Sequence, residues 1–176
     1  MADELKIKDR TIRLIKGDIA DLDIDAFVYY AQPSLVLGSG FGGAIATRGG
    51  PKVQEELKKL GTISTGEAVV TSAGNMKARY IIHAVGPRFQ EEETEKKLET
   101  TVKNALRRAE EKGIQRLAFP AMGAGFYGIP LDLCSRVLIG EVKNYLANSN
   151  SLKEVVICLR DSRDYDVFLS QMKKMA

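Results

Sequence analysis

Residues 116–128 read RLAFPAMGAGFYG, and this stretch decides the fold class. The run 116–119 predicts a buried strand, and the glycines of 123–128 follow it as a turn. A helix is expected to begin at about Leu131. A strand, a glycine-rich turn and a helix in this order are typical of an α/β unit, which binds ligands at the carboxyl ends of its strands. We therefore expect an α/β domain with a ligand site at this turn.

Strand and helix patterns alternate along the rest of the chain. Apolar or β-branched runs predict six strands, at residues 11–15, 26–30, 68–71, 80–85, 116–119 and 155–159. Apolar residues at helical spacing predict helices carried by Val53, Leu57 and Leu60, by Leu98, Val102, Ala105, Leu106 and Ala109, by Val137, Leu138, Val142 and Leu146, and by Val167, Phe168 and Met172. This alternation favours a layered α/β domain. The expected organisation is a short N-terminal extension over residues 1–9 and a single domain over residues 10–176.

The composition is that of a globular chain. Its 176 residues are 44% hydrophobic and 28% charged, without tryptophan. The longest apolar run, residues 26–31, is far shorter than the ~20 residues that a membrane-spanning helix needs. Residues 1–10 are too charged for a secretory signal, and the chain has only two cysteines and one histidine. We therefore expect a cytoplasmic, reducing location, no membrane association and no metal site.

The charge pattern argues against a nucleic-acid partner. The net charge is only +3, from 26 basic and 23 acidic residues, and lysines and arginines are interleaved with glutamates. Electrostatic binding of nucleic acid requires basic residues concentrated on one face or stripe.

A second glycine-rich segment occupies residues 38–43, GSGFGG, and leads into a stretch that can begin a helix. Glycines let backbone N–H groups approach a ligand closely, and a helix N-terminus adds a positive dipole end, so each segment suits a phosphate. Two such segments indicate a diphosphate ligand, although both could simply be tight turns. A dinucleotide-binding fingerprint is disfavoured by the spacing, and no Gly-Lys-Ser/Thr of a P-loop is present.

Six segments in order resemble the macro domain family, whose members bind ADP-ribose. They are KGDI at 16–19, DAFV at 25–28, GAI at 43–45, GEAVVT at 66–71, YIIHAVGP at 80–87 and AFPAMGAGFYG at 118–128. The resemblance implies a three-layer α/β/α sandwich around a mixed six-stranded sheet, with the ligand in a cleft across its crest. The implied partners are ADP-ribose and ADP-ribosylated proteins, including poly(ADP-ribose), and no cofactor is expected.

The resemblance also assigns binding roles. Asp18 would accept the exocyclic amine of adenine, with Ile19 adding a backbone N–H, although Asp18 could instead cap a turn. Tyr127 would pack beside the distal ribose, or it could be a half-buried core tyrosine. The diphosphate and the distal ribose would be held by Gly40, Phe41, Gly123, Ala124, Gly125 and Phe126.

Three positions depart from the hydrolytic members of the family. Those members carry Asn-Ala-Ala-Asn where this chain has residues 29–32, ending in Gln32, and they place an Asp and a His where this chain has Gly42 and Ala46. Glycine and alanine have no group to position water or a proton, so no catalytic residue is assigned beyond Gln32, a weak candidate. Gln32 could also hydrogen-bond the distal ribose.

At the end of the last strand, Arg160 stands where many family members have an aromatic residue that stacks on adenine. Its guanidinium could stack on the base, or it could pair with Asp161 or Asp164. His83 is interpreted as structural, and Cys134 and Cys158 as buried, inert thiols.

The leading hypothesis is thus an ADP-ribose binder with weak or no hydrolysis, monomeric by default. Its alternatives are an ADP-ribosyl hydrolase in which the substrate's own diphosphate positions the water, acting on an ADP-ribosyl ester, O-acetyl-ADP-ribose or ADP-ribose 1''-phosphate, and a module that binds poly(A) RNA.

Overall fold

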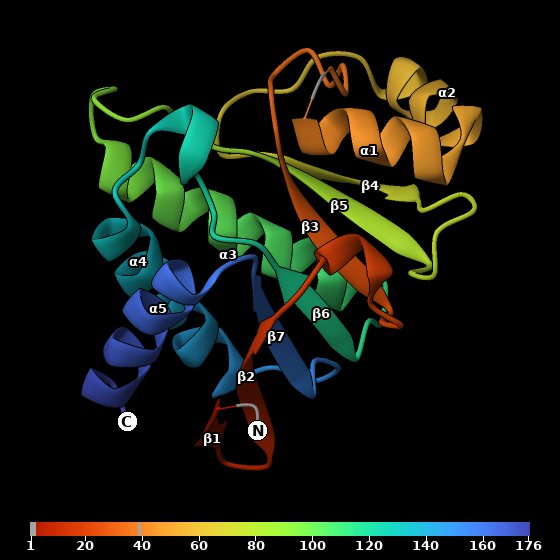
Figure 1. Ribbon diagram of the computed structural model, residues 1–176. Helices are drawn as coiled ribbons and strands as arrows, with labels where there is room; N and C mark the ends of the chain where they lie inside the picture. Colours follow the sequence, from red (N-terminus) through yellow and green to blue (C-terminus); the bar gives the residue numbers. More distant parts are fainter. Residues whose placement is uncertain (1–2, 39) are drawn as a thin grey trace.

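The computed structural model describes residues 3–38 and 40–176, apart from the side chain of Phe126. Within these residues seven strands form one mixed sheet in the order β1-β2-β7-β6-β3-β5-β4 (Figure 1). The strands are β1 Asp3–Ile7, β2 Arg10–Lys16, β3 Ala26–Ala31, β4 Ala68–Ser72, β5 Tyr80–Val85, β6 Arg116–Phe119 and β7 Glu154–Leu159. The helices are α1 Gly40–Gly49, α2 Pro51–Leu60, α3 Thr94–Glu111, α4 Leu131–Leu146 and α5 Ser162–Lys174, with 3₁₀ turns η1 Ile19–Asp21 and η2 Gly125–Tyr127.

The five central strands, β2, β7, β6, β3 and β5, are parallel, whereas the outer strands β1 and β4 are antiparallel to their neighbours. Parallel strands present all their carboxyl ends at one edge of the sheet. The residues that follow β2, β3, β6 and β7 therefore line up along that edge. This edge carries the candidate site.

Helices cover both faces of the sheet, which gives three layers (Figure 1). Alternation along β3 shows how one strand serves both cores: Val28 and Tyr30 pack on the side of α3, α4 and α5, and Phe27 packs on the side of α1 and α2. The expected three-layer α/β/α sandwich is confirmed. No helix in the described parts of the chain is long and apolar enough to span a membrane.

The prediction of six strands was wrong by one. Residues 3–7, expected to lie in an extension before the domain, form β1 and pair with β2 from Asp3 opposite Leu14 to Ile7 opposite Arg10. Three of the five residues in β1 are charged, because this is an edge strand, and charge on an edge discourages pairing with other chains. That charge conceals the strand pattern in the sequence.

The apolar residues predicted to face inward from α3 and α4 are buried, as are Phe168 and Met172 in α5. Two predicted positions are exceptions: Leu60, the last residue of α2, is 45% exposed, and Val167 in α5 is only half-buried. Helix α1 also begins earlier than expected, at Gly40 inside the first glycine-rich segment. The early start places the first turn of α1 at the carboxyl edge of the sheet.

Candidate functional site

Two adjoining cavities, each of about 420 Å³, lie at the carboxyl edge of the sheet. They share four lining residues: Phe41, Pro120, Ala121 and Ala124. The first, here called the Asp18 cavity, is completed by Gly17, Asp18, Ile19, Gly125, Cys158, Leu159, Arg160, Asp161 and Asp164. The second, the Tyr127 cavity, is completed by Tyr29, Tyr30, Gln32, Leu37, Gly38, Gly40, Gly42, Gly123 and Tyr127. Together they form one elongated cleft.

Asp18 follows β2 and does two things at once. Its Oδ1 accepts a hydrogen bond from the Ala20 N–H at 3.0 Å, so it caps η1. Its Oδ2 accepts one from Arg48 Nη1 at 3.0 Å. Burial raises the pKa of this carboxyl, but the bonds from Ala20 and Arg48 and the charges of Arg48 and Arg160 hold it below its ordinary value. The capping role is therefore real, and it is compatible with an ionised carboxylate lining the cavity.

The opposite wall of the Asp18 cavity comes from the end of β7. Arg160 is exposed there, and no ion pair within the described residues joins it to Asp161 or Asp164. Asp161 instead caps α5, accepting a hydrogen bond from the Asp164 N–H at 2.8 Å. The Arg160 guanidinium is thus available to a ligand in this cavity.

Both cysteines are buried free thiols. Burial raises the pKa of Cys158, at the wall of the Asp18 cavity, to about 11, and that of Cys134, in α4, to about 12. Neither forms an appreciable thiolate at neutral pH, so neither is a nucleophile.

The glycines after β6 adopt conformations that other residues avoid. Gly123 and Gly125 have φ angles of 85° and 74°. A Cβ at Gly123 would also lie 2.5 Å from Ile129 Cδ1, whereas a Cβ at Gly125 would meet nothing within 4 Å. The amide of Ala124 is already bonded to Ala121 O at 3.2 Å, so Ala124 offers the cleft its methyl group rather than a donor. Of the predicted residue Phe126, only the backbone, in η2, is described.

The other wall of the cleft is the first turn of α1, where Gly40, Phe41 and Gly42 line the Tyr127 cavity, with Gly38 from the preceding loop. The first N–H groups of an α-helix have no partner inside the helix and carry a partial positive charge, which favours an anion. The Phe41 ring packs against Phe27 and Tyr29, at centroid distances of 5.9 and 5.8 Å. This packing fixes the start of α1 against the sheet.

Tyrosines dominate the far end of the cleft. The ring of Tyr127 is half-buried and lies 4.6 Å from that of Tyr30, whose hydroxyl donates to Pro87 O. The Arg88 guanidinium lies over the outer face of Tyr127, 5.7 Å from the ring centroid. Tyr127 is thus both a cavity wall and a ring packed on the core, so the two interpretations of its sequence position are compatible.

Gln32 lines the Tyr127 cavity, but its amide is committed to the chain. Its Nε2 donates to Val36 O at 2.7 Å, which fixes the path of the loop between β3 and α1. The acceptor Oε1 and the second Nε2 hydrogen are left to face a ligand. Ala46, on the exposed face of α1, does not line the cavity.

Among the described residues, no carboxylate, histidine or cysteine lines the Tyr127 cavity. Its titratable groups are tyrosines, and burial raises the pKa of Tyr29 to about 12. His83 is fully buried in β5 and bonded through Nε2 to Thr71 Oγ1 at 2.9 Å, as its structural interpretation requires. The described residues of the Tyr127 cavity therefore include no group that would exchange protons near neutral pH.

Sequence reasoning missed Arg48, Gly17, Tyr29, Tyr30, Pro120 and Ala121 as parts of the cleft or its support. Tyr29 and Tyr30 end β3 at the carboxyl edge, so strand position alone could have indicated them. Arg48 had no such signal, because it pairs with Asp18 across 30 residues of chain.

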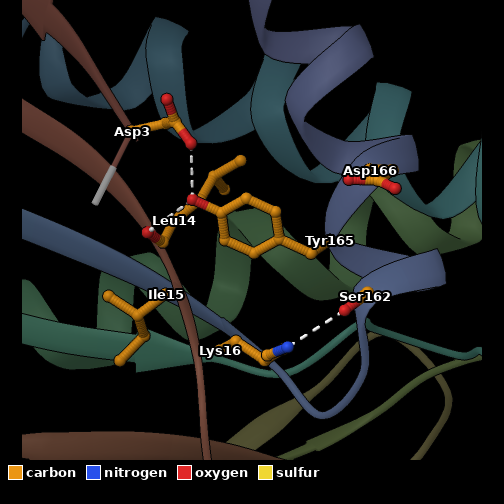
Figure 2. Close-up of a pocket in the computed structure, with 7 residues that line it drawn as sticks. All are labelled: Asp3, Leu14, Ile15, Lys16, Ser162, Tyr165 and Asp166. Carbon is orange, nitrogen blue, oxygen red and sulfur yellow. Dashed lines mark hydrogen bonds between the residues drawn. The ribbon is translucent and has the colours of Figure 1, made fainter. Parts of the chain in front are cut away.

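Another cavity, of about 390 Å³, lies between the start of the sheet and α5 (Figure 2). Its polar groups bond to one another: Tyr165 Oη donates to Asp3 Oδ2 at 2.6 Å, and Lys16 Nζ donates to Ser162 Oγ at 2.9 Å. No glycine is among the described residues that line it. The cleft at the carboxyl edge is therefore the better candidate site.

The sequence of this chain is similar to those of several known proteins. A family model described as Macro domain matches residues 29–138. A macro domain-containing protein of Caldanaerobacter subterraneus subsp. tengcongensis is 42% identical over 163 residues, which cover 89% of this chain and 93% of that protein. An uncharacterized protein of Saccharolobus solfataricus is 42% identical over 163 residues, 90% of each chain.

Solved structures superpose over almost the whole chain. The macrodomain of Oceanobacillus iheyensis with ADP gives a TM-score of 0.94 at 27% identity, covering 99% of this chain and 96% of that one. The Trypanosoma brucei macrodomain in complex with ADP-ribose gives 0.85 at 27% identity, covering 94% of this chain and 69% of that one.

Proposed function

The chain belongs to the macro domain family, and we propose that it binds ADP-ribose, free or attached to protein, in the cleft that the Asp18 and Tyr127 cavities form together. The similar structures from Oceanobacillus iheyensis and Trypanosoma brucei hold ADP and ADP-ribose. Their likeness to this chain over nearly its full length supports the same ligand class here.

The observation that carries the proposal is the order of groups along the cleft. An ionised carboxylate, Asp18, lies at one end, backbone turns of α1 and η2 lie in the middle, and tyrosine rings lie at the other end. Adenine offers an exocyclic amine to a carboxylate, a diphosphate suits unpaired helix amides, and a ribose packs on an aromatic wall. Arg160 adds a planar cation beside the base end.

We propose further that hydrolysis is weak or absent. Positioning water or a proton requires a polar group within about 3 Å of the reacting atoms. Gly42 and Ala46 carry none, and the Gln32 amide holds the loop through Val36 O. The family's catalytic side chains thus have no replacement among the described residues of the Tyr127 cavity.

Two properties remain part of the proposal. The buried free thiols of Cys134 and Cys158 support a reducing, cytoplasmic setting. The cations near the base end, Arg48 and Arg160, form no stripe, so single-stranded poly(A) RNA is disfavoured as the ligand.

Calorimetric titration with ADP-ribose tests the proposal. Saturable binding that is tighter than for AMP is expected, because AMP lacks the second phosphate and the distal ribose. A parallel assay with mono-ADP-ribosylated peptide should show binding with little release of ADP-ribose. No detectable binding of ADP-ribose would overturn the proposal, brisk release would favour the hydrolase alternative, and preferential binding of poly(A) would favour RNA recognition.

A further inference from the structure

Arg48, in the last turn of α1, joins two carboxylates that belong to another part of the chain. Its Nη1 donates to Asp18 Oδ2 at 3.0 Å, and its Nη2 donates to Asp21 Oδ1. Arg48 does not itself line the Asp18 cavity. Its contact with the cavity therefore runs through Asp18.

The Asp18 carboxylate is held by both of its oxygens. Oδ1 takes the Ala20 N–H and Oδ2 takes the Arg48 guanidinium. A carboxylate has about four acceptor positions, so each oxygen keeps one for a ligand after these two bonds are made. Two bonds from different elements, η1 and α1, prevent the carboxylate from rotating and fix the direction of the remaining acceptor positions.

The support behind Arg48 is rigid. Helix α1 is anchored by Ile45, which is fully buried, and by the packing of Phe41 on Phe27. The second carboxylate, Asp21, steadies the guanidinium in the plane that also meets Asp18. A guanidinium can hold two carboxylates in this way, whereas an ammonium is a single point charge.

We propose that Arg48 is a positioning residue for the base end of the cleft, which orients Asp18 so that the site prefers a base with an amino group at position 6. This inference rests on the proposed binding of ADP-ribose and deepens it, because it assigns the choice of base to a residue outside the cavity. Adenine presents a 6-amino group, whereas guanine presents a carbonyl oxygen there, which a carboxylate repels.

The charge of Arg48 has a second effect on Asp18. An ionised carboxylate can accept a hydrogen bond from the amine with either oxygen, whereas a protonated carboxyl group carries an O–H donor of its own. Arg48 helps to hold the pKa of Asp18 below its ordinary value, against the effect of burial and together with Arg160 on the opposite wall. The other titratable groups facing this carboxylate are Asp21, beyond Arg48, Asp161 and Asp164, which line the same cavity, and the thiol of Cys158, whose pKa burial raises to about 11.

The ion pairs of Arg48 are exposed, with 38% of its side chain and 42% of that of Asp18 accessible to solvent. Exposed pairs contribute little to folding stability. Replacing Arg48 is therefore expected to leave the fold intact, which separates an effect on binding from an effect on stability.

The experiment measures the affinity of the full chain for ADP-ribose and GDP-ribose by calorimetry. Arg48→Gln should weaken the binding of ADP-ribose by about tenfold, roughly the loss of one well-oriented hydrogen bond to a charged group. It should leave the affinity for GDP-ribose nearly unchanged. Arg48→Lys should recover only part of the preference. Arg136→Gln is the matched control: Arg136 makes two bonds to Glu95, at 3.0 and 2.9 Å, in an exposed pair outside the cleft.

A pH series from pH 7 down to about pH 3, below the ordinary pKa of an aspartate, supplies a readout that loosening of α1 would not produce. As pH falls, Asp18 takes up a proton and ADP-ribose binding is lost. In Arg48→Gln the pKa of the Asp18 carboxyl should be lowered less than in wild type, because the Arg48 charge and hydrogen bond are gone. The loss of binding should therefore begin at a higher pH than in wild type. Titration of the ligand itself is common to both proteins and cancels in the comparison.

The outcomes separate this inference from the proposed function. If wild type does not bind ADP-ribose at all, the proposed function fails. If wild type binds, but Arg48→Gln keeps the same preference for ADP-ribose over GDP-ribose and the same pH profile, the positioning role is wrong. Equal weakening of both ligands would also overturn it, since a general loosening of α1 would act on both.

Discussion

The carbonyl oxygen of Leu37 occupies the space that a side chain at Gly42 would need. A Cβ built at Gly42 would overlap Leu37 O and would lie 2.5 Å from Tyr29 Oη. Gly42 is buried in the first turn of α1, with the loop between β3 and α1 folded directly onto it. The absence of a carboxylate at this position is therefore built into the backbone of the Tyr127 cavity, and a single substitution cannot restore it.

Gly42→Ala is expected to destabilise the fold by about 3 kcal/mol or more, because the loop carbonyl cannot move away without shifting the start of α1. The matched control is Gly43→Ala, where a Cβ would lie 3.3 Å from Gly38 O. At Gly43 the tight contact should destabilise the variant, whereas the better helix propensity of alanine should stabilise it. The free energy of unfolding should therefore change by no more than about 1 kcal/mol. Urea unfolding of both variants measures the difference. Equal stability of the two variants would show that the loop yields freely.

Asp18→Asn separates the two roles of Asp18. Asparagine caps a turn about as well as aspartate, so η1 should stay folded and the thermal midpoint should change little. The amide provides a neutral acceptor and a donor in place of a carboxylate, so ADP-ribose binding should weaken by about 1.5–3 kcal/mol. Asp18→Ala should lose the same affinity and also the cap. An unchanged dissociation constant for Asp18→Asn would limit Asp18 to the cap.

Ala124 lies on the wall shared by the two cavities, so it tests whether they act as one cleft. Its backbone, with φ −73°, accepts any side chain without strain, and its side chain is half-buried. Ala124→Glu should place bulk and negative charge where the diphosphate is expected and abolish ADP-ribose binding, with little change in the thermal midpoint.

Gly125→Ala is the comparison for that variant. It adds a Cβ into open space at φ 74°, so it should cost about 1 kcal/mol of stability while leaving binding largely intact. Full ADP-ribose affinity in a folded Ala124→Glu protein would mean that the ligand does not cross between the two cavities.

The sequence predicted the parts of this fold that local patterns encode. The five parallel strands and the buried faces of α3 and α4 follow from apolar periodicity. The glycines after β6 mark the cleft because Gly123 and Gly125 need positive φ.

What the sequence did not predict depends on contacts between distant segments. Strand β1 forms because its backbone pairs with the free edge of β2. Its charged residues hide the apolar pattern by which a strand is recognised in a sequence. The approach of Leu37 to Gly42 and the bond from Arg48 to Asp18 arise only when loops and helix are assembled on the sheet. These two relationships define the ends of the cleft, so its chemistry was less predictable than its location.

His83, the single histidine of the chain, should make stability depend on pH. Burial lowers its pKa to about 3, against an ordinary value of 6.5, so between these values the unfolded chain binds a proton that the folded chain does not. Stability should therefore fall as pH drops below about 6.5, by at most about 1.4 kcal/mol per pH unit.

The control for this pH dependence is His83→Gln, which removes the titrating ring. The variant should be less stable than wild type, because glutamine replaces a buried ring. Its free energy of unfolding should nevertheless vary less with pH between pH 6.5 and about pH 5, below which carboxyl groups also contribute. Denaturant unfolding at several pH values measures both slopes. Parallel slopes for wild type and variant would mean that His83 takes up its proton without unfolding.

The last prediction concerns turnover. Hydrolysis of mono-ADP-ribosyl-glutamate should be slow, because binding substrate and product equally well does not accelerate the breaking of a bond. Acceleration needs a group that activates water, and the described titratable groups of the Tyr127 cavity are tyrosines. With its pKa raised to about 12, Tyr29 is protonated at neutral pH and cannot act as a base.

Release of ADP-ribose from a modified peptide, followed by chromatography, measures that turnover. Tyr29→Phe and Gln32→Asn should both leave the slow rate unchanged, the first because a protonated hydroxyl takes no proton, and the second because a neutral side-chain amide takes no proton from water. Brisk wild-type turnover that survives both substitutions would contradict the prediction and indicate water activated by the diphosphate of the substrate. A fall in rate with either variant would instead assign that side chain a part in the reaction.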